Sequence, residues 1–411
     1  SYIFSKFVLQ KIGMASQSEI NSEMNNDIKR RNKVPVIFVT GTHYEVGFDV
    51  GRTFSSMIKN FITNYKRLQD FESQYKTEAG KQAYETTLSN MQKRYPQYIN
   101  EIQGTADGAG VPFYKLFLLQ MDDIIETVNE NNISNDVGGC SSIGINHSDI
   151  TVLGHTEDSF AETLNHFYIL SAHIVPSCED VAQGATNESF SSLCYAGHLP
   201  GYTMGFTENG LIFSINTLSP KRLKPGNTPR TFLTRAMLAA HDKQQLISIL
   251  ADEGLGTANG FSLNMIWSSG KNINELYNFE VAPNLNGDRS VINEQEFGKN
   301  EVLIHCNRYE REKVPEVIGL IIDSSAARIK CLRTHVIPKN ISDIEDMLSD
   351  QSGGEYVVFQ NKDNVIIKTI AAGIFDLKEM VWKIYIKRPN NYEPTAVLPI
   401  RFKSSMKCIC K

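Results

Sequence analysis

Residues 138–158 constrain the fold more than any other stretch of the chain. Apolar and polar residues alternate on both sides of the polar tetrad at 146–149, which predicts two strands joined by a tight hairpin. Directly paired residues on neighbouring strands lie roughly 5 Å apart. The hairpin is therefore expected to place Cys140 close to the segment 155–158, which ends in an aspartate.

Cys140 has two interpretations on this local pattern. It follows Gly138 and Gly139, and glycine tolerates backbone conformations that strain other residues, so the peptide bond before the cysteine could be strained and open to cleavage. A free cysteine is also one of the most frequently buried residues and often does no more than fill a core. The pattern alone leaves both interpretations open.

Length, charge and cysteine content limit the kinds of protein that this chain can be. The 411 residues suffice for one large or two ordinary domains, and a formal charge of −5 gives no basic footprint of the kind that nucleic acid requires. Seven scattered cysteines are typical of a reducing compartment. No apolar run approaches the roughly 20 residues that span a bilayer. We expect a cytoplasmic protein with neither a nucleic-acid nor a membrane partner.

The first third of the chain predicts helices. Residues 15–33 are polar and charged with few large apolar groups, and we expect residues 1–33 to form a mobile N-terminal arm. A β-branched run at 34–39 follows, and the segment 34–139 then shows apolar residues at helical spacing, with helices expected near 81–93 and 111–128.

The segment 140–411 has a different character, because short alternating stretches such as 166–175 and 211–218 predict antiparallel strands. Thr228 is expected to cap a helix, and the apolar run 356–359 is expected to be a strand. Helices followed by many strands predict an α+β protein in which helices cover the outer faces of two antiparallel sheets.

The stretch 138–158 resembles the processing site of the penicillin-acyltransferase-like branch of the N-terminal nucleophile (Ntn) hydrolases. Precursors of that family cleave themselves before a cysteine, and an aspartate follows this cysteine by eighteen residues, as Asp158 follows Cys140. Further segments resemble family motifs and spread the resemblance from about Pro35 to Arg328: 41–52, 101–110, 205–216, 302–307 and 323–328.

The resemblance implies a fold and a maturation step. The fold is a four-layer αββα sandwich of two antiparallel sheets with an N-terminal helical segment. Autocatalytic cleavage between Gly139 and Cys140 would produce two fragments, 34–139 and 140–411, which stay associated as one globular unit.

The resemblance also implies roles for five residues. Cys140 would be the nucleophile, with its own freed α-amine as the base, and Asp158 would orient that amine. Asn216 and Asn307 would donate hydrogen bonds to the oxyanion. Arg328 would favour the thiolate or hold the Asp158 carboxylate. Without the resemblance, Asn216 is more typical of a turn. A surface cation is the alternative interpretation of Arg328.

Among animal members of the family, the chain resembles insect hydrolases of β-alanyl amines. This implies a small-molecule amide substrate such as N-β-alanyldopamine or carcinine, and Glu157 could bind its ammonium group, although an exposed charge beside a turn is the commoner role. Three alternatives stay open: an acyltransferase or hydrolase of another small amide, an unprocessed papain-like thiol hydrolase, and a silent scaffold.

No cofactor or metal is expected. His305 and Cys306 are adjacent on a predicted strand, so their side chains should point to opposite faces, and no ligand set in the sequence closes a zinc site. The family's usual histidine after Asn307 is Arg308 in this chain, which leaves the role of that position open.

Overall fold

The computed structural model describes residues 30–128, 139–147, 149–269, 274–362 and 367–403. Gly138 and most of the predicted N-terminal arm lie outside these residues. Arg30, near the end of that arm, donates hydrogen bonds to the carbonyl oxygens of Ile370 (2.8 Å) and Ile386 (2.6 Å). The last part of the arm is therefore fixed to the body of the protein.

Helices dominate the described chain before Cys140, as predicted. They are α3 (His43–Thr53), α4 (Ser55–Asn64), α5 (Lys66–Tyr75), α6 (Glu78–Arg94), α7 (Pro96–Ala109) and α8 (Phe113–Glu126). Thr42 and Glu45 form a capping box at the start of α3, which satisfies backbone N–H groups that lack a partner in the first turn. Pro96 begins α7, where its missing N–H costs nothing.

Helices α3 and α7 cross with their backbones in contact. A Cβ atom added to Gly47 of α3 would lie 2.1 Å from the carbonyl oxygen of Glu101, and one added to Gly104 of α7 would lie 2.1 Å from that of Tyr44. Only glycine permits so close an approach. The small residues in 101–110 therefore set the distance between the two helices.

Two sheets make up most of the remaining chain. The eight-stranded sheet has the order β1 (Val36–Gly41), β4 (Phe167–Ile174), β5 (Glu188–Tyr195), β6 (Met204–Thr207), β7 (Leu211–Leu218), β8 (Gly260–Ser268), β9 (Asn274–Ala282) and β10 (Val291–Phe297). The six-stranded sheet has the order β11 (Val302–His305), β2 (Ser141–Asn146), β3 (Thr151–Phe160), β12 (Ile367–Asp376), β13 (Val381–Tyr385) and β14 (Ala396–Pro399).

The expectation of two purely antiparallel sheets is wrong at one edge. Strand β1 pairs with β4 in parallel, with Val36 opposite Ile169 and Gly41 opposite Ile174. The six N-terminal helices lie between these strands in the sequence, and a connection of that length allows parallel pairing. The other pairings of named strands are antiparallel.

The helices after Cys140 are α9 (Cys178–Ala182), α10 (Arg230–Ala236), α11 (Lys243–Ala251), α12 (Leu320–Leu332) and α13 (Ile341–Leu348). Thr228 does not cap α10 as predicted, because Pro229 is the cap residue and the Thr228 hydroxyl donates to Asp252 Oδ2 at 2.6 Å. The run 356–359 is not a strand, although Val357 and Val358 are buried.

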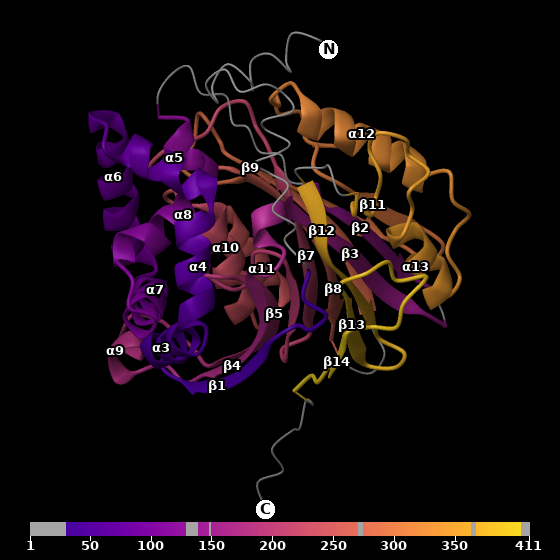
Figure 1. The fold of residues 1–411 in the computed structure, drawn as a ribbon, viewed down its shortest axis with the longest axis horizontal. Coiled ribbons are helices and arrows are strands. Elements are labelled where there is room, and N and C mark those ends of the chain that lie inside the picture. Colours follow the sequence, from indigo (N-terminus) through magenta and orange to yellow (C-terminus); the bar gives the residue numbers. More distant parts are fainter. Residues whose placement is uncertain (1–29, 129–138, 148, 270–273, 363–366, 404–411) are drawn as a thin grey trace, which may run out of the picture.

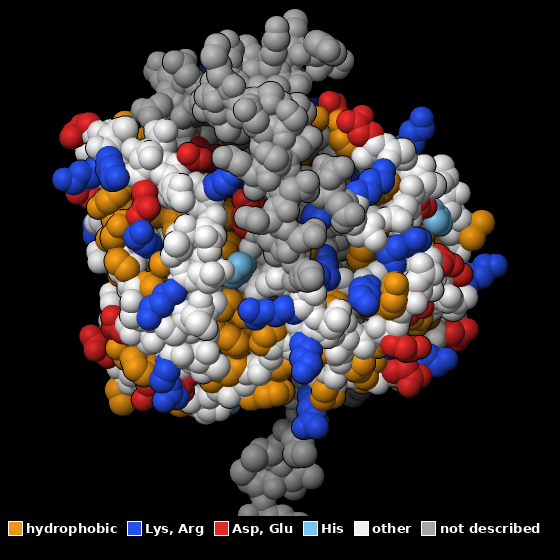
Figure 2. Space-filling model, viewed as in Figure 1, with side chains coloured by type: hydrophobic (Ala, Val, Ile, Leu, Met, Phe, Trp, Pro, Cys, Tyr) orange, Lys and Arg blue, Asp and Glu red, His pale blue; other side chains and the backbone are white. Residues whose placement is uncertain are grey.

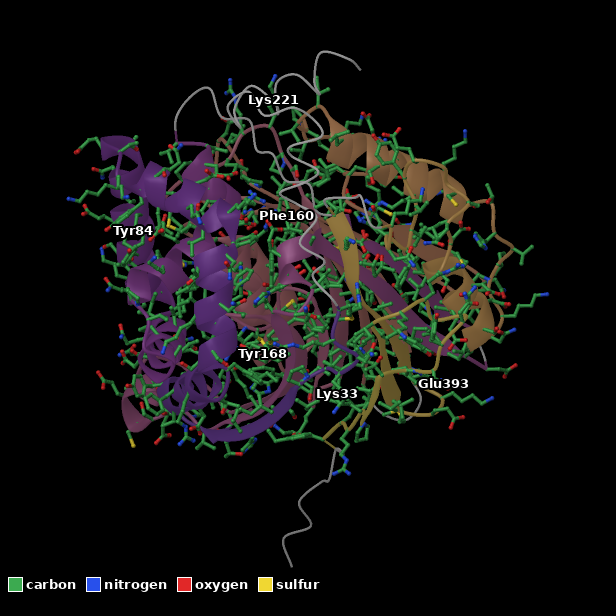
Figure 3. All side chains as sticks on the ribbon, viewed as in Figure 1. Lys33, Tyr84, Phe160, Tyr168, Lys221 and Glu393 are labelled. Atoms are coloured by element: carbon green, nitrogen blue, oxygen red, sulfur yellow. The ribbon has the colours of Figure 1, made fainter. Side chains whose placement is uncertain are left out.

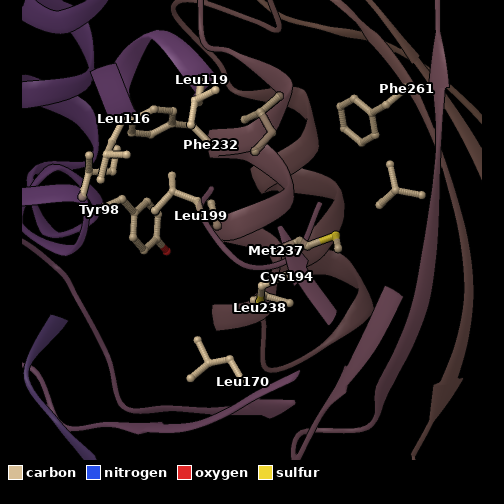
Figure 4. Packing of buried hydrophobic residues seen from close by; sticks show 14 of the residues in the cluster. Tyr98, Leu116, Leu119, Leu170, Cys194, Leu199, Phe232, Met237, Leu238 and Phe261 are labelled. Carbon is tan, nitrogen blue, oxygen red and sulfur yellow. The ribbon is translucent and has the colours of Figure 1, made fainter. Parts of the chain in front are cut away.

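The helices and the two sheets lie in layers (Figure 1), and the three larger of the four apolar clusters among the described residues lie between these layers. The N-terminal helices and α10 pack on one face of the eight-stranded sheet; Figure 4 shows part of this core, with Leu119 of α8 and Phe232 of α10. Tyr168 of β4, labelled in Figure 3, stacks on Phe54 there with ring centroids 4.2 Å apart. A second core lies between the two sheets, and a third packs α12 and α13 on the six-stranded sheet. The predicted α+β class, with two sheets and N-terminal helices, is confirmed.

Charged side chains of both signs occur over the face drawn in Figure 2. Among the described helices, none combines the length and the apolar character that crossing a bilayer would require.

Candidate active site

The predicted hairpin places Cys140 where the sequence indicated. Strands β2 and β3 pair with Ser141 opposite Thr156, and the backbone N–H of His147 donates to the carbonyl oxygen of Ile150 (2.8 Å) in the turn. The Sγ atom of Cys140 lies 3.9 Å from the carbonyl oxygen of Asp158. Local alternation was therefore sufficient to bring the cysteine to the end of the second strand.

Cys140 is buried, with 4% of its surface exposed. Burial raises the pKa of its thiol well above the ordinary value, the carboxylate of Glu157 raises it further, and Arg328 opposes these effects. In the intact chain the thiol is protonated at neutral pH. A nucleophile in this position needs a nearby group that accepts its proton.

Asp158 faces the junction between Gly139 and Cys140. Its Oδ1 atom accepts a hydrogen bond from the Thr369 hydroxyl at 2.5 Å, whereas Oδ2 is buried and has no hydrogen-bond partner among the described residues. A Cβ atom added to Gly139 would lie 3.6 Å from that Oδ2. Burial raises the pKa of the Asp158 carboxyl to about 8, against the opposing effect of Arg328. The carboxyl therefore holds a proton at neutral pH in the intact chain.

Arg328 connects the cysteine to a second predicted residue. Its side chain projects from α12, is fully buried, and donates from Nη1 to the Cys140 carbonyl oxygen (2.6 Å) and to Ser141 Oγ (2.8 Å). Its Nη2 donates to Asn307 Oδ1 at 2.9 Å. The interpretation of Arg328 as a surface cation is wrong. The guanidinium fixes the backbone of Cys140 and the amide of Asn307 together.

Asn216 and Asn307 both lie near this hairpin. Asn216 Oδ1 accepts hydrogen bonds from Asn264 Nδ2 (2.6 Å) and from Ser142 Oγ (3.1 Å), while its Nδ2 is buried without a partner among the described residues. Asn307 Nδ2 donates to the Thr217 carbonyl oxygen at 3.1 Å. Asn216 lies within β7, so the turn-forming interpretation is wrong. Its amide is a donor that still lacks an acceptor.

Glu157 is buried and not exposed, contrary to the commoner role expected for it. It is 6% exposed, its Oε1 accepts from the Tyr195 hydroxyl at 2.6 Å, and its Oε2 is hydrogen-bonded to His155 Nε2 at 3.0 Å. A ring nitrogen of His155, a carboxylate oxygen of Glu157 and the Sγ of Cys140 lie within 4.8 Å of one another. These three residues form a cluster on the inner side of the hairpin.

The sequence interpretation missed His155, Tyr195 and Thr369. Strand alternation could have found His155, because residues i and i+2 of a strand share a face and Glu157 was already a candidate. Tyr195 of β5 and Thr369 of β12 come from distant strands. No local sequence pattern predicts that these two residues reach the site.

His305 and Cys306 are neighbours in the sequence with different contacts. His305 Nε2 is bonded to Glu280 at 3.0 Å, whereas Cys306 Sγ contacts Ser141 Oγ at 3.5 Å, so these neighbours serve different surroundings. Arg308, which stands where the family has a histidine, pairs through Nε with Glu310 at 3.1 Å.

Comparison with known proteins identifies the family. The sequence model of the acyl-coenzyme A:6-aminopenicillanic acid acyl-transferase family matches residues 145–391. The chain belongs to this family. A relative from Drosophila melanogaster, beta-alanyl-dopamine/carcinine hydrolase, is 42% identical over 385 residues, which cover 92% of this chain and 98% of the relative. The family match includes Asp158 and Arg328 and begins just after Cys140.

Proposed function

We propose that this chain is a self-processing cysteine amidohydrolase of the Ntn type that cleaves small β-alanyl amides. Its substrates would be N-β-alanyldopamine, giving β-alanine and dopamine, and carcinine, giving β-alanine and histamine. The named activity of the 42% identical relative supports the substrate class. The structural observation that carries the proposal is the Oδ2 atom of Asp158, which is buried beside the junction at Gly139 and has no hydrogen-bond partner among the described residues.

Cleavage before Cys140 would give the Oδ2 atom of Asp158 a partner. The new α-amine has an ordinary pKa of about 7.7 to 8.0 and would lie beside Asp158, where an ammonium group lowers the pKa of the carboxyl and forms an ion pair with it. In its neutral form the amine would take the thiol proton directly or through one water and become the ammonium that Asp158 holds, which makes Cys140 both nucleophile and base.

The next step needs donors for the developing oxyanion. The Nδ2 of Asn216, which has no acceptor in the described part of the chain, can supply one. Asn307 Nδ2 donates to the carbonyl oxygen of Thr217 (3.1 Å) and more weakly to its hydroxyl (3.4 Å), while Arg328 holds Asn307 Oδ1, so the amide of Asn307 would turn to the oxyanion at the expense of the weaker contact. Removing one such donor typically raises the barrier by about 3 kcal/mol.

The position of Glu157 is consistent with a substrate whose ammonium group lies close to the scissile carbonyl. A β-alanyl group separates its ammonium from its carbonyl by two methylene groups, so the carboxylate that binds it must lie near the nucleophile. Glu157 lies within 4.8 Å of Cys140 Sγ, and Tyr195 holds it in place.

The layers of the fold support the finer assignment as a four-layer αββα Ntn sandwich, and several contacts would hold the segments 34–139 and 140–411 together after cleavage. Strand β1 belongs to the first segment and pairs with β4 of the second. The buried Arg235 of α10 donates across the two segments to Glu101 of α7 at 2.8 Å, and Glu188 of its own segment accepts from the same guanidinium at 2.6 Å.

The test is to purify the full chain and its Cys140→Ala variant, with Cys178→Ala, an exposed thiol, as the matched control. Gel electrophoresis and mass spectrometry should show a fragment beginning at Cys140 in the parent and control chains and an intact Cys140→Ala chain. The first two should release β-alanine from both substrates.

Other outcomes separate the alternatives. An intact chain that hydrolyses substrate would favour a papain-like enzyme and contradict self-processing. A cleaved chain that releases no β-alanine would indicate another small amide, and an intact, inactive chain with an unreactive thiol would indicate a scaffold.

A further inference from the structure

The proposed base of the mature enzyme does not exist in the intact chain. Until the bond after Gly139 breaks, the nitrogen of Cys140 is an amide and cannot accept a proton. The thiol must nevertheless lose its proton to attack the Gly139 carbonyl carbon. A different group must therefore serve the first reaction.

Asp158 is unsuited to this task. Its pKa is raised to about 8, so at neutral pH its carboxyl already carries a proton, and the Thr369 hydroxyl donates to its other oxygen. Arg328 has no lone pair to offer, since a guanidinium is a donor only.

The cluster beside the thiol has the required acceptor. His155 is fully buried, and its Nδ1 is hydrogen-bonded to Ser142 Oγ (2.9 Å) and its Nε2 to Glu157 Oε2 (3.0 Å). Tyr195 donates to the other oxygen of Glu157 at 2.6 Å. The pair is thus fixed at both ends, with one atom of each residue within 4.8 Å of Cys140 Sγ.

We propose that the buried His155–Glu157 pair takes the thiol proton of Cys140 during self-cleavage, before the α-amine exists. This inference rests on the proposed function, because it concerns the maturation step of that same site. It assigns Glu157 two successive tasks: it accepts a proton in the intact chain and binds the substrate ammonium in the mature one.

The S–H bond breaks and its proton passes to the imidazole–carboxylate pair; the sulfur electron pair then forms a C–S bond to the Gly139 carbonyl carbon. Collapse of the tetrahedral adduct breaks the C–N bond, and the pair returns the proton to the departing nitrogen. The product is a thioester with a free α-amine on Cys140. Water then cleaves the C–S bond, which leaves a carboxylate on Gly139 and restores the thiol.

The experiment follows self-cleavage in the full chain made by cell-free translation, with the intact band and the fragments quantified over time on a gel. His155→Gln can keep hydrogen bonds to Ser142 and Glu157 but cannot take up a proton. Its half-time for self-cleavage should be about 100-fold longer than that of the parent chain, the usual effect of a lost general base. His241→Gln, at an exposed histidine, is the matched control and should cleave at the parent rate.

Chemical rescue separates proton transfer from a structural role. Added imidazole should restore cleavage to His155→Ala, because the truncated side chain leaves room for the missing ring, and Glu157→Gln should be slow with or without imidazole. Equal half-times for the parent, His155→Gln and Glu157→Gln would overturn the inference, as would slow His155→Ala cleavage without rescue. A parent chain that never cleaves would instead overturn the self-processing part of the proposed function.

Discussion

Replacement of Asp158 by asparagine should stabilise the intact chain at neutral pH. Burial raises the pKa of this carboxyl from 3.8 to about 8, so folding at pH 7 must take up a proton that the unfolded chain does not hold. Asparagine has the same shape, can accept the hydrogen bond from Thr369 through its own Oδ1, and has no charge to desolvate.

The size and sign of this stabilisation follow from the pKa values of Asp158 in the unfolded and folded chains. Because the carboxyl pKa is higher in the folded chain, Asp158 does not destabilise the native state below about pH 4, where both states hold the proton. As the pH rises from about 4 to about 8, the native state loses about 1.4 kcal/mol of stability per pH unit. At pH 7 the loss is at most about 4 kcal/mol, which asparagine avoids. With an unfolding entropy of about 2.1 cal/mol/K per residue, this corresponds to a rise in Tm of about 5 °C for a chain of this length.

The comparison should use Cys140→Ala and Cys140→Ala/Asp158→Asn, so that neither chain can cleave. Urea unfolding at about pH 5, 7 and 9 should give a difference in the free energy of unfolding that grows between the first two and levels off beyond about 8. Other titrating groups, such as Glu316 with a pKa raised to about 7, are common to both chains and cancel. A difference independent of pH, or an asparagine variant that is less stable at pH 8, would refute the reasoning.

Three further changes test the site and the fold. Asn216→Ala should lower kcat/KM of the processed enzyme about 100-fold through loss of an oxyanion donor, and unaltered kinetics would exclude that role. Arg235→Met should lower the free energy of unfolding in urea by about 3–5 kcal/mol, because Glu101 and Glu188 lose their buried cation. Gly47→Ala should lower the Tm sharply, since its Cβ would lie 2.1 Å from the Glu101 carbonyl oxygen; the control Gly298→Ala, which meets only Glu301 Oε2 at 3.3 Å, should change it little.

Local patterns predicted the elements on which the site depends. Alternation around 146–149 predicted the β2–β3 hairpin, and the strand expected at 211–218 has the bounds of β7, which holds Asn216. These segments have one register that buries their apolar residues, so neighbours in the sequence suffice to define them. The structure gathers the five predicted residues around this hairpin; their catalytic roles stay predictions.

Features that depend on distant partners could not be predicted. Thr228 has the composition of a cap, but its hydroxyl bonds Asp252. The run 356–359 is as apolar as a strand, but these residues are buried against α13 and do not pair with a strand. Alternation shows that His155 shares a face with Glu157 but does not show that Tyr195 approaches from the other sheet. Such contacts arise only when the sheets stack.

The pairing of β1 with β4 has a practical consequence for anyone who would produce the two halves of this protein separately. A polypeptide that ends at residue 139 would expose the edge of β1 that pairs with β4, and its Glu101 carboxylate would lose the Arg235 cation. The polypeptide that begins at residue 140 would expose the edge of β4 and the apolar face of the sheet that the N-terminal helices cover. Neither half is expected to stay in solution by itself, so the two genes would have to be expressed in the same cell, and mixing after separate purification should yield aggregates.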